Sequence, residues 1–469
     1  MRTYYIDPFG CVKNQVDAET MMAVLNGAGW QAAEDSADAD LIIINSCGFI
    51  DSAKQESINA VLSYRKAYPG KKILLAGCLS QRYGAELAAS LPEADGLFGN
   101  TDLTRAAAAA DAVMAPGALL GIAADIAPAA TGTKTAPGAA PVTPPASPGD
   151  RPLLSLPGSA YVKIAEGCNN RCTFCVIPVI RGGLRSRAIP GIVEECRRLL
   201  ERGIRELCLI GQDLGSYGRD SGENADLPAL LEALSALEGQ FWVRLLYIHP
   251  DNFPLPILDL FRRDERFLPY FDIPFQHGSA PILRAMNRRG NADSYLRLTD
   301  TIRVALPDAV IRSTFLTGFP GETGEDFEAL LDFQDKLKLD WAGAFAYSRE
   351  EGTPAYAMKN RVPKKLAAER KQIIEERQIP ISQNRMERFI GRTMDVLVEE
   401  RISAANAAVD AGPSPEAADD GGLYLGRLAC QAPEVDGAAV ISTDRDLEPG
   451  TFVRGRVFAR AGFDLEVRV

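Results

Sequence analysis

The chain has 469 residues, which is too many for one compact core and favours about three domains. Its 46% hydrophobic and 24% charged residues are ordinary for a globular protein, and we see neither a signal peptide nor an apolar run that could cross a bilayer. We therefore expect a cytoplasmic protein, in which clustered cysteines are better explained as metal ligands than as disulfides. The formal net charge of −11 argues against broad nucleic-acid affinity, which requires basic surface.

Residues 1–125 alternate strand and helix three times, which predicts a doubly wound parallel α/β domain. We expect strands at residues 4–6, 41–45 and 73–76, and helices near residues 16–28, 53–68 and 81–91. A cysteine with a glycine beside it follows each strand, at Cys11, Cys47 and Cys78. Because parallel strands end at one ligand-binding edge, these cysteines are expected to meet there and hold a cluster. The alternative is three isolated core thiols.

Residues 126–159 are rich in Ala, Pro, Thr and Gly, which predicts an extended linker. Six strand and helix units follow, so residues 160–390 are expected to form a partial parallel (β/α)6 barrel with a connecting helix. The strands are expected at residues 160–165, 206–211, 242–248, 270–274, 310–317 and 342–347. The connecting helix, residues 364–390, is expected to be interrupted around Pro380.

Three thiols lie close together after the first strand of this barrel, at Cys168, Cys172 and Cys175. Their C-x-x-x-C-x-x-C spacing is one ligand short of a four-thiolate zinc site or an ordinary ferredoxin cluster. A cubane iron–sulfur cluster held by three cysteines keeps one iron open, where a small molecule can bind and be cleaved. Three reduced cysteines that merely line a loop are the alternative.

Residues 391–469 change in character, with short strands separated by Gly, Pro and Asp turns, which predicts a small all-β barrel. The strands are expected at residues 395–399, 423–426, 438–441, 452–458 and 464–467, with a loop at residues 404–422. This segment contains 8 Arg, no Lys and 14 Asp plus Glu, a formal net charge of −6. Such a charge suits a basic protein partner better than RNA, although it could serve solubility alone.

The spacing of Cys168, Cys172 and Cys175, with Phe174 before the third, resembles the radical S-adenosylmethionine (SAM) superfamily. The two three-cysteine sets, the partial barrel and the terminal β-barrel together resemble the methylthiotransferases of that superfamily, whose terminal domain is called TRAM. Three runs resemble the members that modify a ribosomal protein: GCVKNQVDAE at 10–19, YSREEGTPA at 347–355 and QAPEVDG at 431–437. Three others resemble the family in general: LIGQD at 209–213, YFDIPFQH at 270–277 and TGFPGET at 317–323.

The resemblance implies two 4Fe-4S clusters and two molecules of SAM per turnover. Cys168, Cys172 and Cys175 would hold the cluster that cleaves SAM, and Cys11, Cys47 and Cys78 would hold an auxiliary cluster that carries the sulfur to be methylated. Further residues would contact SAM, with Phe174 at the adenine and Gly211, Gln212 and Asp213 at the methionine end. No side-chain acid or base is expected to be catalytic, because the bond to be broken is an unactivated C–H bond.

The implied substrate is the β-carbon of an aspartate of the twelfth small-subunit ribosomal protein, a basic partner. Methylthiolation of a tRNA adenosine is the nearest alternative, and a non-catalytic iron–sulfur sensor or ribosome-binding factor is another. A flavodoxin or ferredoxin would supply electrons, and we expect neither membrane attachment nor strong nucleic-acid binding.

Several residues have more than one reading. Arg181, Arg185 and Arg187 could balance SAM or a cluster, or pair with surface carboxylates. His277 could contact a ligand or simply hold its strand end. The remaining cysteines, Cys196, Cys208 and Cys430, are expected to be buried structural residues.

Overall fold

The computed structural model describes residues 2–115, 121–122, 148–222, 225–402 and 422–469. Most of the predicted linker and nearly all of the predicted loop at 404–422 lie outside these residues. The contacts divide the chain into two compact units. The first unit contains residues 1–154, 163–187 and 348–357, and the second contains residues 155–162, 188–347 and 358–469.

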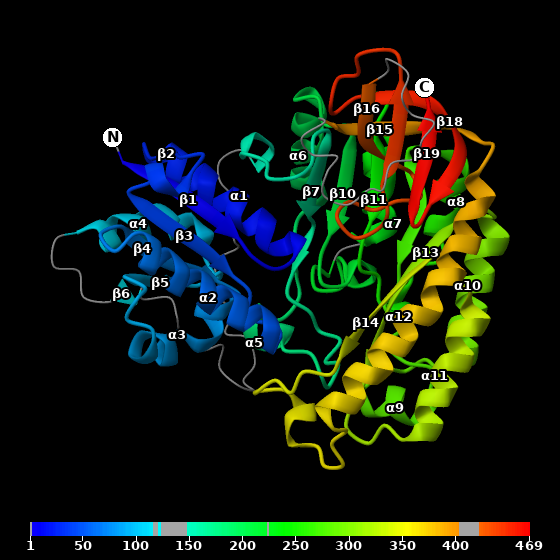
Figure 1. Ribbon diagram of the computed structural model, residues 1–469, viewed down its shortest axis with the longest axis horizontal. Coiled ribbons are helices and arrows are strands. Elements are labelled where there is room, and N and C mark those ends of the chain that lie inside the picture. The colour runs from blue at the N-terminus through cyan, green and yellow to red at the C-terminus, as the bar shows by residue number, and fades with distance from the viewer. Residues whose placement is uncertain (1, 116–120, 123–147, 223–224, 403–421) are drawn as a thin grey trace. The chain divides into compact units, whose positions relative to one another are not determined.

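The first unit is built on a six-stranded parallel sheet with the order β2-β1-β3-β4-β5-β6 (Figure 1). Its strands are β1 (Thr3–Pro8), β2 (Gln31–Ala32), β3 (Leu41–Ser46), β4 (Lys72–Gly77), β5 (Gly96–Phe98) and β6 (Gly121–Ile122). The order reverses between β1 and β3, which confirms the doubly wound prediction. We did not predict β2, β5 and β6, because two or three residues are too few to show a period.

Helices cover both faces of this sheet: α1 (Val12–Gly27), α2 (Asp51–Ala67), α3 (Cys78–Ser90) and α4 (Ala106–Met114). The central strand β3 serves two cores, because its side chains alternate between the faces. Leu41 and Ile43 pack in a core with α1 and α4, whereas Ile42 and Ile44 pack in a core with α2 and α3. Burial of both faces explains the uninterrupted apolar run of β3 in the sequence.

The second unit contains a parallel sheet whose strands pair in chain order, β7-β10-β11-β12-β13-β14. The strands are β7 (Ser159–Lys163), β10 (Glu206–Ile210), β11 (Trp242–Leu245), β12 (Phe267–Asp272), β13 (Val310–Thr317) and β14 (Trp341–Ala346). The two edges of this open sheet are β7 and β14, and all six strands lie where we predicted them, which confirms the partial barrel.

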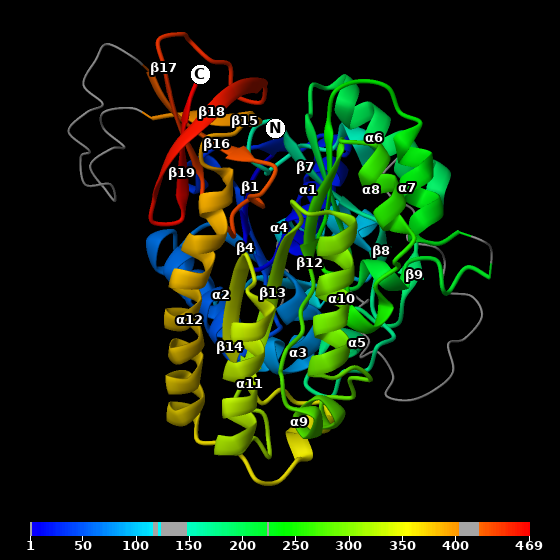
Figure 2. The same ribbon diagram turned by 90° about the vertical axis from the view of Figure 1, so that its right-hand side faces the viewer.

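The helices of the second unit are α6 (Ile189–Glu201), α7 (Leu227–Ser235), α8 (Ile257–Arg263), α9 (Ala280–Ala285), α10 (Ala292–Ala305), α11 (Gly324–Leu337) and α12 (Lys364–Met386). The predicted interruption at Pro380 is wrong, since α12 continues through it and packs along β14 (Figure 2). The buried Gln378, two residues before the proline, ties the helix to its surroundings by a hydrogen bond to the Leu339 carbonyl, and a second bond to Ser382 Oγ spans the proline within the helix. None of the described helices has both the length and the apolarity to span a bilayer.

The C-terminal strands close into a barrel with the order β15-β16-β17-β19-β18, which confirms the all-β prediction. They are β15 (Thr393–Arg401), β16 (Gly422–Leu428), β17 (Ala439–Thr443), β18 (Phe452–Ala461) and β19 (Asp464–Arg468). Closure pairs every strand on both sides and leaves no open sheet edge.

A buried charge network joins this barrel to the central sheet within the second unit. Arg427 of β16 pairs with Glu206 of β10 and with Glu399 of β15, and Arg244 of β11 pairs with the other oxygen of Glu206. Glu206 and Arg244 are fully buried. We call these four residues the Glu206 network.

Candidate functional site

The three N-terminal cysteines follow neighbouring strands of the first sheet, as predicted. Cys11 comes after β1, Cys47 after β3 and Cys78 after β4, and these strands pair side by side in the order β1-β3-β4. Cys11 is exposed, whereas Cys47 and Cys78 are buried. The sheet thus brings the three thiols to its carboxyl edge, with Cys11 and Cys47 on either side of the point where strand order reverses.

Glycines allow the loops that carry these cysteines to touch. Gly10 has φ +94°, and a Cβ there would lie 2.9 Å from Cys47 Cβ and 3.1 Å from Cys47 Sγ. A Cβ at Gly48 would lie 2.7 Å from the Cys78 carbonyl oxygen. We expected these glycines to admit a cofactor, which stays a prediction. The structure shows that they let one cysteine loop approach the next.

Burial disfavours the thiolate form of Cys47 and Cys78, and a nearby cation counteracts this effect. Burial raises the pKa of Cys47, and burial raises the pKa of Cys78 to about 12. The Arg181 guanidinium opposes both shifts, while the neighbouring thiols reinforce them. Three thiols that influence one another in this way, beside a buried arginine, are a donor set suited to an iron–sulfur cluster, because iron binds the thiolate form.

The second three-cysteine set lies on a loop between β8 (Ala165–Glu166) and the short helix α5 (Ile177–Ile180). Gly167 starts the loop with φ +73°, and a Cβ there would lie 2.1 Å from the Gly183 carbonyl oxygen. The Cys168 amide donates to the Gly182 carbonyl at 3.2 Å, and the Cys175 amide donates to the Cys172 carbonyl at 3.0 Å. The loop is therefore folded back on the strand β9 (Arg185–Ser186) that follows it.

The loop of Cys168, Cys172 and Cys175 packs against the site of Cys78 within the first unit. Val176, the residue after Cys175, forms a buried apolar cluster with Cys78 and Ile180. The segment at 348–357 also contacts this loop, since the Ala355 amide donates to the Thr173 carbonyl at 2.9 Å. Both cysteine sets consequently belong to one compact part of the molecule.

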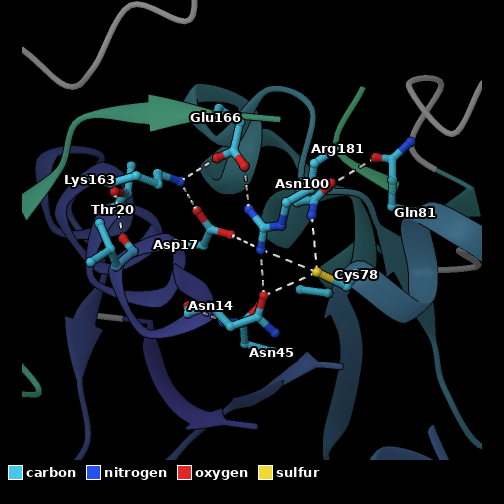
Figure 3. A network of polar contacts seen from close by, with 12 residues as sticks. Asn14, Asp17, Thr20, Asn45, Cys78, Gln81, Asn100, Lys163, Glu166 and Arg181 are labelled. Atoms are coloured by element: carbon cyan, nitrogen blue, oxygen red, sulfur yellow. Dashed lines mark hydrogen bonds and ion pairs between the residues drawn. The ribbon is translucent and has the colours of Figure 1, made fainter. Parts of the chain in front are cut away.

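Four charged side chains form a closed ring next to Cys78 (Figure 3). Lys163 and Arg181 each pair with both Asp17 and Glu166, at distances between 2.5 and 3.0 Å. Arg181 Nη2 also donates to Cys78 Sγ at 3.2 Å. We call these four residues the Arg181 ring. Arg181 does pair with carboxylates, but at 3% exposure its side chain is buried and not on the surface. That it balances a cluster stays a prediction.

The other two arginines of this segment differ from Arg181. Arg185 is exposed in β9, and Arg187 Nη1 donates to the Lys163 carbonyl at 2.7 Å. Sequence reasoning did not single out Asp17, Lys163 and Glu166 as site residues. The alternation of two cations and two carboxylates appears only when α1, β7 and β8 are brought together.

Glu350 is a further residue whose role the sequence alone did not reveal. Its carboxylate accepts hydrogen bonds from Lys54 at 3.0 Å, from Arg82 at 2.6 Å and from Ser348 Oγ at 2.6 Å. Arg82 also donates to the Gly48 carbonyl at 2.9 Å. The segment at 348–357 is thereby tied to the loop that follows Cys47.

The residues expected at SAM are placed as follows. Phe174 is half-buried on the cysteine loop in the first unit, and Gly211, Gln212 and Asp213 follow β10 in the second unit. The Asp213 carboxylate accepts four hydrogen bonds, from the Gly215 and His249 amides, Ser216 Oγ and Asn252 Nδ2. Asp213 thus shapes the loop after β10 through its own contacts.

Both histidines hold their own loops. His249 Nδ1 accepts the Asp251 amide at 3.2 Å, and burial lowers the pKa of this imidazole to about 3. His277 is fully buried, and its Nδ1 accepts the Ser279 amide at 2.9 Å. The strand-end role that we weighed for His277 is the one its contacts favour.

All nine cysteines lie in the described part of the chain, and none forms a disulfide. The predicted structural cysteines, Cys196, Cys208 and Cys430, are at most 2% exposed. Among the described residues, no three His, Cys, Asp or Glu side chains converge to hold a metal ion. The thiolates of a cluster bind its separate corners, so a cluster site does not require convergence on one point.

Family models match three successive parts of the chain. They are the uncharacterized protein family UPF0004 at residues 3–99, the radical SAM superfamily at residues 162–333 and the TRAM domain at residues 390–469. A solved radical SAM methyltransferase, TsrM from Kitasatospora setae with cobalamin and a 4Fe-4S cluster bound, has a TM-score of 0.54 at 15% identity and covers 76% of this chain and 74% of its own. This likeness concerns the fold alone.

Relatives match over nearly the full length. The ribosomal protein uS12 methylthiotransferase RimO of Treponema denticola is 45% identical, with coverage of 98% of this chain and 99% of its own. The protein of the same name from Desulforudis audaxviator is 40% identical, with coverage of 98% and 95%. The chain therefore belongs to the RimO family of radical SAM methylthiotransferases.

Proposed function

We propose that this enzyme adds a methylthio group to the β-carbon of an aspartate of ribosomal protein uS12. The observation that carries the proposal is the full-length similarity to methylthiotransferases whose name specifies uS12, at 45% and 40% identity. The acidic C-terminal segment supports it, because a net charge of −6 is complementary to a basic ribosomal protein. A ribosomal substrate favours the cytoplasm as the location of the reaction.

Two cluster sites are proposed, one for each set of three cysteines. Cys168, Cys172 and Cys175 would hold the cluster at which SAM binds, and Cys11, Cys47 and Cys78 would hold an auxiliary cluster. When bound, the two clusters would supply the electron for reductive cleavage of SAM and an attachment point for the sulfur. The donor set fits, since each site has three thiols and glycines whose missing side chains make close approach possible.

The protein side chains would bind and position rather than transfer protons. An unactivated C–H bond has no acidic proton for a general base, so the low histidine content of the chain is no obstacle. Phe174 would pack at the adenine of SAM. Gly211, Gln212 and Asp213 would line its methionine end, with the four hydrogen bonds to Asp213 fixing the loop. Two molecules of SAM would be consumed per turnover, and a flavodoxin or ferredoxin would donate electrons.

We further propose four functional segments along the chain. They are the cluster-bearing N-terminal domain at residues 1–125, the linker at 126–159, the radical SAM barrel with its connecting helix at 160–390 and the TRAM domain at 391–469.

The proposal can be tested with the reconstituted enzyme under anaerobic conditions. It would be incubated with SAM and reductant, with a peptide containing the uS12 aspartate and a tRNA anticodon stem-loop offered in parallel, and both would be weighed by mass spectrometry. We expect a methylthio mass gain on the peptide alone. A gain on the RNA alone would establish tRNA methylthiolation instead, and intact SAM with neither product would leave a sensing or binding role.

Matched cysteine variants sharpen this test. Cys168→Ala should lower product formation about 100-fold or more, because the open cluster loses a ligand. Cys196→Ala removes a thiol that is fully buried in α6, outside both cysteine sets, and should leave product formation unchanged. Full product formation by Cys168→Ala would contradict the assignment of this loop.

A further inference from the structure

Arg181 makes an unusual contact for an ion-paired arginine. Its Nη2 lies 3.2 Å from the sulfur of Cys78, and it also lies 2.8 Å from Asp17 Oδ2 and 2.7 Å from Asn14 Oδ1. The side chain is 3% exposed, so water does not compete for these bonds. A guanidinium that already has carboxylate partners is therefore held with one edge against a cysteine sulfur (Figure 3).

The Arg181 ring keeps this guanidinium in place. Two cations alternate with two carboxylates, so the ring carries no formal net charge, and none of the four side chains is more than 17% exposed. A lone buried arginine would pay a large desolvation cost, which the ring offsets. Because both oxygens of Asp17 are engaged, the direction of the Arg181 donor is fixed by the protein before any cluster binds.

The ring also connects the two cysteine sets. Asp17 lies on α1, which begins directly after Cys11, while Glu166 is two residues before Cys168. Arg181 follows α5, whose Ile180 packs with Cys78. A donor to the sulfur of one site is thus supplied by the segment that carries the other site.

We propose that Arg181 is a positioning residue that raises the reduction potential of the auxiliary cluster by donating a hydrogen bond to the Cys78 sulfur. This inference rests on the auxiliary cluster of the proposed function. One-electron reduction adds negative charge to a cluster and to its sulfur ligands. A buried donor with a positive charge stabilises the reduced form more than the oxidised form, and hydrogen bonds to the sulfurs are one of the means by which proteins set cluster potentials.

Two substitutions should move the potential in opposite directions. Arg181→Gln removes the positive charge beside Cys78, so the midpoint potential should become more negative. Asp17→Asn removes a negative charge while keeping an oxygen that can accept from Arg181, so the midpoint potential should become more positive. If the substitutions acted only by loosening the packing, the two shifts of the midpoint potential would not be expected to have opposite signs.

The measurement is a redox titration of the reconstituted full-length chain, followed by electron paramagnetic resonance. Replacing Cys168, Cys172 and Cys175 by Ala in the same chain assigns the signal of the auxiliary cluster. Bound iron is measured for each variant. Arg65→Gln is the matched control, since Arg65 pairs with Asp95 and donates to the carbonyl of Lys71, which directly precedes β4 and lies at the opposite end of this strand from Cys78. It should leave the potential unchanged.

Opposite shifts for Arg181→Gln and Asp17→Asn, with bound iron retained, support the inference. Unchanged potentials, or shifts of the same sign, overturn it. If the Arg181→Gln variant binds no auxiliary cluster, the Asp17→Asn variant decides alone: a more positive midpoint potential supports the inference, and an unchanged or more negative one overturns it. Absence of iron from the chain in which Cys168, Cys172 and Cys175 are replaced would instead overturn the auxiliary cluster itself. A normal cluster whose potential does not respond to the substitutions would overturn only the role of Arg181.

Discussion

The Arg181 ring and the Glu206 network are both buried groups of two cations and two carboxylates. The cations are an arginine and a lysine in the ring, and two arginines in the network. In the Glu206 network, Arg427 and Arg244 take both oxygens of Glu206, and Arg427 also pairs with Glu399. In the Arg181 ring, the same kind of pairing leaves a donor at 3.2 Å from a cysteine sulfur. Similar ion pairs therefore attach the β-barrel to the central sheet in the Glu206 network, and hold a donor beside a candidate cluster ligand in the Arg181 ring.

This difference shows that burial and ion pairing alone do not identify a functional charge. The two arginines and two carboxylates of the Glu206 network pair with one another, and Arg427 Nη2 also donates to the Ser159 hydroxyl at 2.8 Å. What distinguishes the Arg181 ring is an acceptor that is itself a candidate metal ligand. Substitutions in the Glu206 network should accordingly change the stability of the protein, whereas substitutions in the Arg181 ring should change the reduction potential of the cluster.

The largest effect is expected from Glu206→Gln. Loss of this carboxylate leaves Arg244 and Arg427 buried without their shared partner, which should lower the free energy of unfolding by about 3–5 kcal/mol. Hydrogen exchange in β10 and β16 during urea unfolding would measure it. The matched control is Glu194→Gln, since Glu194 also pairs with two arginines but is exposed to solvent, and its replacement should cost much less stability. Equal losses for the two variants would show that the network does not hold the barrel.

A smaller effect is expected from Gly77→Ala, which crowds the backbone and side chains beside Cys78 without changing any charge. Gly77 has φ +93°, and a Cβ would lie 2.6 Å from Asn45 Oδ1 and 2.7 Å from the Ser46 carbonyl oxygen. We expect a loss of about 1–3 kcal/mol in stability and less iron bound next to Cys78.

Gly29→Ala separates backbone strain from this crowding. Gly29 has a similar φ of +87°, but a Cβ added there would meet no atom within 4 Å. Its replacement should cost about 1 kcal/mol and leave the bound iron unchanged. If both variants lose iron equally, crowding at Asn45 is not the cause.

The Glu206 carboxylate should also make stability depend on pH. Burial tends to raise the pKa of Glu206, but Arg427 and Arg244 outweigh it and lower the pKa to about 2. A carboxyl with a depressed pKa in the folded state stabilises the protein above its unfolded pKa of about 4.3, and this contribution is lost as the pH falls through about 2. Protection of β10 and β16 from exchange should therefore decline between these pH values. Glu206→Gln should make this decline with pH shallower. An unchanged decline would contradict its attribution to protonation of Glu206.

The sequence predicted the sheets better than it predicted the charge networks. Continuous apolar runs such as β3 and the alternating strands of the C-terminal barrel carry their period in a few adjacent residues, and they were found close to their observed bounds. Short elements such as β2 have no period to detect. Helix α12 passes Pro380 because tertiary contacts of Gln378 outweigh the local preference of proline.

The placement of the six cysteines after their strands followed from topology, because the rule that ligands gather at the carboxyl ends of parallel strands needs only the strand assignment. The partners of Arg181 could not be found in the same way. Asp17, Lys163 and Glu166 resemble ordinary surface charges in the sequence, and their ring depends on packing between distant segments, since Asp17 and Lys163 are 146 residues apart in the chain. A charged residue shows its role only when its partner is known.

The two cysteine sets also differ in how much of the polypeptide must fold before their three thiols lie close together. Cys168, Cys172 and Cys175 are held within eight residues of chain, so their mutual distance is bounded even when the chain is unfolded. Cys11, Cys47 and Cys78 come together only after β1, β3 and β4 have paired. Iron retained by a denatured chain would accordingly be held by the loop, whereas occupancy of the strand-end site reports that the N-terminal sheet has folded.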